Sequence, residues 1–278
     1  MGRNPLIWGL HAEPPRVLSF GVGLLPFILL CAVYLTASHA RLADNPQDKL
    51  LPSPQAMVAA MTRMMTEPDT RSGEYLFFLD TLASVRRIAA GVFLAGVAGL
   101  LLGVNTSLFP GLRALVLPVL TAAGKVPPLA LLPILFISVG IGEEAKIVLI
   151  FIGIVFSIAL DTCLAVDKIP HEQIVKVVTL GASELGAVYR VVTPQIIPRL
   201  LDTMRLSLGP AWLFLIASEA IASAEGLGYR IFLVRRYLAM EIIIPYVLWI
   251  TLLAFLFDLS LRLFVRAQYP WYVHGKGA

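Results

Sequence analysis

The chain has 278 residues, of which 58% are hydrophobic and only 14% are charged, and its mean hydropathy of +0.82 is far above that of an ordinary soluble domain. This composition argues against a soluble protein and predicts a chain that lies in a lipid bilayer. The net charge of +4 is too small and too dispersed to indicate nucleic-acid binding. Cys31 and Cys163 both fall in apolar runs and indicate neither a disulfide framework nor a zinc site.

The first predicted element is a transmembrane helix. Residues 1–16 are polar and lack a small-residue cleavage site, so we expect a retained tail and not a signal peptide. Residues 17–38 contain no charged side chain. This run is long enough to cross the hydrocarbon core of a membrane, which needs roughly 20 residues of helix. Residues 39–87 then predict a water-exposed or interfacial segment. A helical stripe in it predicts an amphipathic surface helix: Met57, Val58, Met61, Met64 and Met65.

The next two spans differ in regularity. Residues 88–112 predict a second helix, along which small residues recur every four positions: Gly91, Ala95, Gly99 and Gly103. Small residues let helix backbones approach closely, so the pattern favours tight packing within the chain, with a dimer interface as the alternative. Residues 114–142 predict a broken third span, because four prolines interrupt it: Pro118, Pro127, Pro128 and Pro133. Irregular backbone at membrane depth makes this span a candidate wall of a transport pathway.

Three more spans complete a fold class of an all-α membrane protein with six transmembrane helices. They cover residues 147–166, 206–224 and 242–261. Asp258 and Arg262, at the end of the last span, lie four residues apart, so that they could pair on one helical face. Six spans place both termini on the same side of the membrane. Basic residues are divided almost equally between the two sets of loops, so the positive-inside rule does not choose that side.

Between the fourth and fifth spans, residues 179–200 predict a short amphipathic helix outside the membrane. Ser183 is a candidate N-cap, and Glu184 lies where the helix dipole favours a negative charge. Leu185, Val188 and Val192 share one face, and Pro194 is expected to end the helix. Such a stripe must be buried against a neighbouring element or against another protein.

The chain contains no pattern for catalysis or nucleotide binding. Gly124-Lys125 lacks the remaining residues of a phosphate-binding loop, and the four histidines are scattered. We therefore expect no catalytic residue, no metal and no cofactor in this chain, so uphill transport would draw on an ion gradient or on another subunit. Lys125 and Glu219 are the charges set most deeply among apolar residues, and each must have a partner or a watery cavity. A pathway role and a structural role are both open for them.

The chain resembles a known family, the permease subunits of binding-protein-dependent ABC importers, from about residue 51 to residue 271. Five segments carry the resemblance: Val126-Pro127-Pro128-Leu129-Ala130 with Pro133, Gly140-Ile141-Gly142-Glu143-Glu144 before Lys146, Gly181-Ala182-Ser183 followed by Pro194 and Pro198, Ala217-Ser218-Glu219, and Gly226-Leu227-Gly228-Tyr229. Together they are similar to the group that imports taurine, other sulfonates, nitrate or bicarbonate. One departure is Val175-Lys176-Val177, which stands where the family usually has Glu-Ala-Ala.

The resemblance implies a type I ABC importer permease fold, with a core domain at residues 88–266 and a cytoplasmic coupling loop at residues 167–205. It also implies an inner-membrane homodimer with cytoplasmic termini, including the tail 267–278. Two ATPase subunits that bind ATP and Mg²⁺ and a periplasmic binding protein would complete the transporter. The residues expected to contact or position the ATPase are Gly181, Ala182, Ser183, Glu184, Leu185 and Val188. Those expected in the transport pathway are Lys125, Ser218 and Glu219.

Two other functions fit parts of the sequence. A self-sufficient secondary carrier or channel would use Glu219 and Asp161 to couple to an ion gradient, but inverted internal repeats typical of such carriers are not visible. A passive membrane anchor would use the loop only to recruit a soluble protein. That hypothesis leaves the buried charges and the broken third span without a role.

Overall fold

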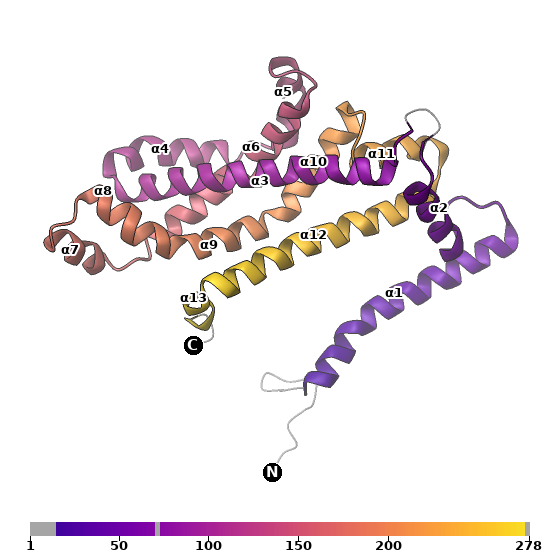
Figure 1. Cartoon of the computed structure of the whole chain (residues 1–278), viewed down its shortest axis with the longest axis horizontal. Coiled ribbons are helices and arrows are strands. Elements are labelled where there is room, and N and C mark those ends of the chain that lie inside the picture. The colour runs from indigo at the N-terminus through magenta and orange to yellow at the C-terminus, as the bar shows by residue number, and fades with distance from the viewer. Residues whose placement is uncertain (1–14, 70–72, 276–278) are drawn as a thin grey trace, which may run out of the picture.

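The computed structural model describes residues 15–69 and 73–275, and this part of the chain is helical throughout, without strands (Figure 1). The α-helices in chain order are α1 (Arg16–Asp44), α2 (Pro54–Thr66), α3 (Leu76–Leu108), α4 (Pro110–Ala123), α5 (Leu132–Ser138), α6 (Glu143–Val166), α7 (His171–Thr179), α8 (Glu184–Ala187), α9 (Thr193–Leu206), α10 (Leu208–Ala222), α11 (Leu227–Val234), α12 (Met240–Gln268) and α13 (Pro270–Gly275). The 3₁₀ helices are η1 (Pro128–Leu131) and η3 (Arg235–Tyr237), and η2 (Val188–Val192) is a π-helix.

Four of these helices, α1, α3, α6 and α12, are individually long and apolar enough to cross a membrane. Two bent pairs raise the number of candidate spans to six. One pair joins α4 to η1 and α5 with a bend of 86°, and the other joins the helical stretch 184–206 to α10 with a bend of 45°. The broken third span is thereby confirmed, and the predicted number of six spans is reached when each bent pair is counted as one span. In Figure 1, α7 and α8 lie toward one end of the molecule, and α2 and α11 lie toward the other.

The glycine pattern of α3 serves packing within the chain. A Cβ atom at Gly91 would lie 2.7 Å from Ile150 Cγ2, and one at Gly99 would lie 2.5 Å from Ile158 Cγ2. Both isoleucines belong to α6 and are fully buried. The favoured interpretation of the small-residue repeat, tight packing within the chain, is confirmed.

The second span begins earlier than predicted. Helix α3 starts at Leu76, so residues 76–87, expected in the interfacial segment, belong to the helical bundle. The reason is that Asp80, Ser84 and Arg87 are buried with polar partners on other helices. Side chains that look like loop residues in the sequence are therefore internal.

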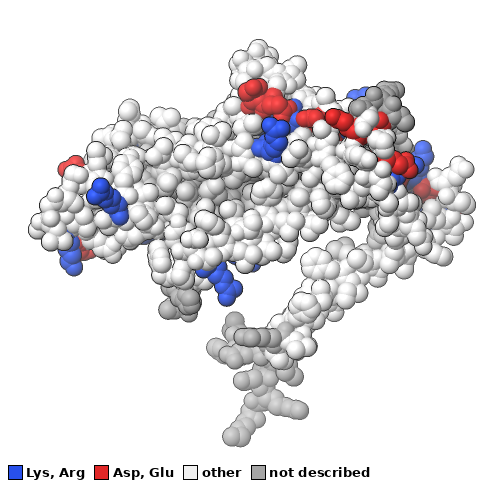
Figure 2. All heavy atoms as spheres, viewed as in Figure 1, with Lys and Arg blue, Asp and Glu red and all other residues white. Residues whose placement is uncertain are grey.

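The rest of the predicted interfacial segment contains the expected amphipathic helix, α2. Ser53 caps it by accepting a hydrogen bond from the Ala56 amide, and Met61 and Met64 pack against the core. Val58 remains exposed. On the face of the molecule seen in Figure 2, uncharged side chains cover most of the surface, and the charged ones lie mainly toward its ends and along its upper and lower edges. This distribution is the one expected of a bundle embedded in lipid.

Candidate functional site

The predicted coupling segment, residues 179–200 within the loop 167–205, begins with a sharp turn. Helix α7 ends at Thr179, and Gly181 adopts a φ of +92°, a conformation that glycine accepts without strain. Ala182 then donates its amide hydrogen to the Val177 carbonyl at 3.2 Å. Ser183 starts α8 by accepting a hydrogen bond from the Gly186 amide at 3.1 Å. The predicted N-cap and the role of Gly181 in the turn are confirmed.

Pro194 does not end the helix, contrary to the prediction. The helical path runs on from Glu184 to Leu206, and the π-helix η2 lies just before the proline. Pro194 has no amide hydrogen, and its ring would collide with the carbonyl of an ordinary preceding turn. The wider turn avoids that collision, and Thr193 donates both its amide and its hydroxyl hydrogen to the Val188 carbonyl.

The apolar stripe of the coupling segment is divided between two environments. Val188 is only 5% exposed and packs with Val192 and Ile196 in a cluster that also contains Val104 and Val166. Leu185, in contrast, is 60% exposed, and Glu184 and Ser183 are exposed beside it. The expectation that Val188 presents a contact surface is therefore corrected. The short helix is held by its own chain through Val188 and Val192, and it offers Leu185 outward.

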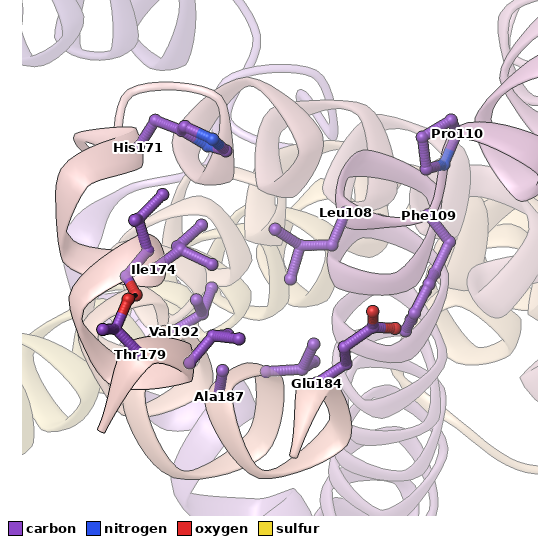
Figure 3. Close-up of a pocket in the computed structure, with 12 residues that line it drawn as sticks. Leu108, Phe109, Pro110, His171, Ile174, Thr179, Glu184, Ala187 and Val192 are labelled. Atoms are coloured by element: carbon purple, nitrogen blue, oxygen red, sulfur yellow. Dashed lines mark hydrogen bonds between the residues drawn. The ribbon is translucent and has the colours of Figure 1, made fainter. Parts of the chain in front are cut away.

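A cavity of about 400 Å³ lies beside this segment (Figure 3). Its walls come from α7, from α8 and from the junction of α3 with α4, and they include His171, Ile174, Phe109 and Ala187. Val175 also lines it, together with Val178. Val175 is the first residue of Val175-Lys176-Val177, the segment that stands where the family usually has Glu-Ala-Ala. This departure thus places an apolar side chain against a mainly apolar cavity.

Asp167 fixes the start of the coupling loop to α4. Both of its carboxylate oxygens accept hydrogen bonds from Arg113 at 2.8 Å, and it also accepts one from the Ser107 hydroxyl. The Arg113 guanidinium, with the Ser107 hydroxyl assisting, lowers the pKa of Asp167 below its usual value. A lowered pKa stabilises the fold above the unfolded value of about 3.9, and this contribution is lost as the pH falls through the folded value.

We predict that Asp167→Asn lowers the melting temperature of the purified chain at pH 7, because the ion pair is lost. The difference from the unmutated chain should shrink at pH 3, because the carboxylate of the unfolded chain is largely protonated below about 3.9 and the folded chain then gains less from the ion pair. Thermal unfolding at both pH values measures it. Asp44→Asn, which makes the same change at a residue with no ion pair to the described residues, is the control, and an equal effect of both substitutions would contradict the prediction.

Glu219 is the centre of a buried polar network that joins α3, α6, α10 and α11. It is fully buried and accepts hydrogen bonds from the Ser84 hydroxyl at 2.7 Å, the Arg87 guanidinium at 2.7 Å and the Gly228 amide at 2.8 Å. Arg87 also donates to Glu143 at 2.7 Å, and Lys146 donates to the same Glu143 oxygen at 2.7 Å. We call these residues, with Asp80 and Arg230, the Arg87–Glu219 network.

Asp80 completes the network on its other side. It accepts hydrogen bonds from the Gly226 amide at 2.9 Å and from the Arg230 guanidinium at 2.7 Å, while Ser84 accepts one from the Leu227 amide. Three successive amides at the start of α11 are therefore satisfied by side chains of α3 and α10. Sequence reasoning missed Asp80, Ser84, Arg87 and Arg230, although the burial of Glu219 among apolar residues signalled that partners must exist.

The predicted pathway residues are not brought together. Ser218 is fully buried and donates its hydroxyl hydrogen to the Leu215 carbonyl, so neither it nor Glu219 is accessible to a solute in this conformation. Lys125 is exposed in the turn between α4 and η1, and its side chain makes no hydrogen bond or ion pair with a residue that the structure describes. Asp161, which a gradient-driven carrier would use, is paired with Arg199 at 2.6 Å.

Comparisons with known proteins identify the family. Residues 95–273 match the family described as the binding-protein-dependent transport system inner membrane component. The taurine transport system permease protein TauC of Escherichia coli is 31% identical over 266 residues, which cover 94% of this chain and 92% of TauC. The bicarbonate transport system permease protein CmpB of Synechocystis is 29% identical over 231 residues, covering 83% of this chain and 81% of CmpB.

The fold is also found among solved structures. A chain of the MetNI methionine ABC transporter in an inward-facing conformation aligns with a TM-score of 0.62 and 22% identity, covering 73% of this chain and 99% of that chain. This match shows a shared type I ABC importer permease fold. The chain therefore belongs to the inner-membrane components of binding-protein-dependent transport systems, in the group whose relatives are taurine, sulfonate, nitrate and bicarbonate permeases.

Proposed function

We propose that two copies of this chain form the pathway for a small organic or inorganic anion, such as taurine, another sulfonate, nitrate or bicarbonate. A separate ATPase that binds ATP and Mg²⁺ supplies the energy, and a binding protein on the other side of the membrane delivers the anion. The observation that carries the proposal is Leu185, an exposed apolar side chain on a short helix whose opposite face is buried in its own chain. A surface of this kind suits docking to another protein.

In this proposal α8 transmits the movement of the ATPase. The helical path from Glu184 to Leu206 meets α10 at a bend of 45°, and α10 carries Glu219. A displacement of α8 would therefore move α9 and α10 as packed bodies and shift the bundle between outward- and inward-open states. The contacting residues are Ser183, Glu184 and Leu185, Gly181 and Ala182 form the turn before them, and Val188 holds the helix to the bundle.

This assembly places the loop 167–205 and both termini in the cytoplasm. Lys125, an exposed cation at the break of the third span, is the proposed pathway residue, because a cation there attracts an anionic solute. A pathway role for Ser218 and Glu219 requires the Arg87–Glu219 network to open in another state of the transport cycle.

The proposal predicts that Leu185→Asp abolishes coupling. A carboxylate at the centre of an apolar contact should cost about 2 kcal/mol or more, which lowers co-purification of the ATPase more than tenfold. The measurement is co-purification, together with ATP-driven anion uptake in vesicles. Val188→Asp is unsuitable because Val188 is buried.

Leu50→Asp is the control, since Leu50 is also exposed and lies between α1 and α2, and it should retain the ATPase. Full retention of the ATPase and of uptake by Leu185→Asp would refute the coupling role. If the permease alone concentrated the anion in sealed vesicles without nucleotide, a gradient-driven carrier would replace the whole proposal.

A further inference from the structure

A second cavity, of about 490 Å³, lies where α9, the end of α12 and α13 meet. Three arginines line it: Arg205 from α9, and Arg262 and Arg266 from α12. Asp202 and Tyr272 complete its polar wall. This cavity is separate from the coupling segment and from the Arg87–Glu219 network, since no residue is shared between them.

The charges around this cavity are not balanced. Asp258 accepts a hydrogen bond from Arg262 at 2.8 Å, as their spacing of four residues allows, and it lies 3.1 Å from Arg205 Nε. Asp202 lies 3.6 Å from Arg205. The Arg266 side chain makes no hydrogen bond or ion pair with any residue among 15–69 and 73–275. Among the residues that the structure describes, three guanidinium groups thus face two carboxylates, and Arg266 is available to an anion.

The position of the cavity at the end of α12 indicates which kind of anion it binds. Helix α12 is one of the candidate membrane spans, and Arg262 and Arg266 lie in its last turns. Leu263, Phe264 and Trp271 remain exposed beside them. Trp271 also stacks edge-to-face on the rings of Tyr269 and Tyr272. Aromatic residues with arginines at the end of a span are typical of the level of the lipid headgroups.

We propose that this cavity binds the phosphate of an anionic phospholipid, with Arg262 and Arg266 as its ligands and the adjacent apolar side chains of α12 against the acyl chains. Guanidinium groups recognise phosphate through two parallel hydrogen bonds. Basic pockets between membrane helices are known to hold such headgroups. A free phosphate ion offers the same chemistry to the arginines but leaves the apolar side chains without a partner.

The test is native mass spectrometry of the full-length purified chain, titrated in detergent with phosphatidylglycerol or with zwitterionic phosphatidylcholine. The unmutated chain should prefer phosphatidylglycerol. The double variant Arg262→Gln, Arg266→Gln should bind it about 30-fold more weakly, because each arginine near a membrane surface contributes about a factor of five. The charge-preserving variant Arg262→Lys, Arg266→Lys should keep part of the preference, because lysine supplies the charge but not the paired hydrogen bonds, and this separates loss of charge from misfolding.

Arg235→Gln, Arg236→Gln is the matched control, because it removes the same two charges from η3, which precedes the opposite end of α12, and it should bind as the unmutated chain does. Retained binding by the Arg262→Gln, Arg266→Gln variant, or an equal loss in the control, would overturn the proposal. A third arm adds inorganic phosphate. If it displaces phosphatidylglycerol at an equal concentration, the site takes soluble phosphate and the lipid assignment is wrong.

Discussion

Replacing Arg87 with methionine should lower the free energy of unfolding of the permease by about 3–5 kcal/mol, the usual cost of removing one member of a buried ion pair. The Arg87 side chain is 1% exposed and that of Glu219 is 0% exposed. Without the guanidinium, the Glu219 carboxylate would keep only the Ser84 hydroxyl and the Gly228 amide. Glu143 would lose its partner from α3 at the same time.

Chemical or thermal denaturation of the full chain in detergent measures this effect. Arg86→Met is the control, since it makes the same substitution at the adjacent residue, which is exposed, and should cost little. Adding Glu219→Gln to Arg87→Met should recover part of the loss, because no uncompensated charge remains buried. Equal losses at Arg86 and Arg87 would show that the network does not stabilise the fold.

Several features of this fold follow from rules that act over short distances along the chain. Ser183 caps α8 because its hydroxyl reaches an amide three residues away, and the prolines of the third span break it between Ala123 and Pro128. The number of spans follows equally from the length of each apolar run. Such features could be predicted from the sequence, since each depends on residues within a turn or two.

The features that were missed depend on distant residues. Arg87 and Glu219 are 132 positions apart, and Asp80 and Arg230 are 150 apart. In the sequence, Asp80 and Arg87 simply resemble the polar end of a loop, which misplaced the start of α3. The stripe of Leu185 and Val188 shows a related difficulty, because helical periodicity marks an apolar face without saying whether its own chain or another protein covers it.

The network also explains why three of the segments that resemble the family occur together. Glu143 from the Gly140–Glu144 segment, Glu219 from the Ala217–Glu219 segment and the amides of Gly226 and Gly228 meet around side chains of α3. Gly226 has a φ of +123°, and a Cβ atom on it would lie 2.5 Å from the Glu219 carboxyl carbon. Glycine is therefore required there both by backbone conformation and by the approach of the carboxylate.

Substituting valine for Gly99 should lower the free energy of unfolding, with an effect second only to that of Arg87→Met. The reason is that the new side chain would push α3 away from α6. The new Cβ atom would lie 2.5 Å from Ile158 Cγ2 and 3.0 Å from Ile158 Cβ, and Ile158 is fully buried. Overfilling a packed interior usually costs about 1–3 kcal/mol. Denaturation of the full chain in detergent measures the loss.

Gly21→Val is the matched control, since no atom lies within 4 Å of a Cβ placed at Gly21, and it should be nearly neutral. Ile158→Ala supplies a more stringent test. That substitution alone should destabilise the chain by leaving a cavity, but Gly99→Val should cost less in its presence, because the valine then fills the space vacated by the isoleucine. If the two substitutions were simply additive, the contact between Gly99 and Ile158 would not be what limits the approach of α3 to α6.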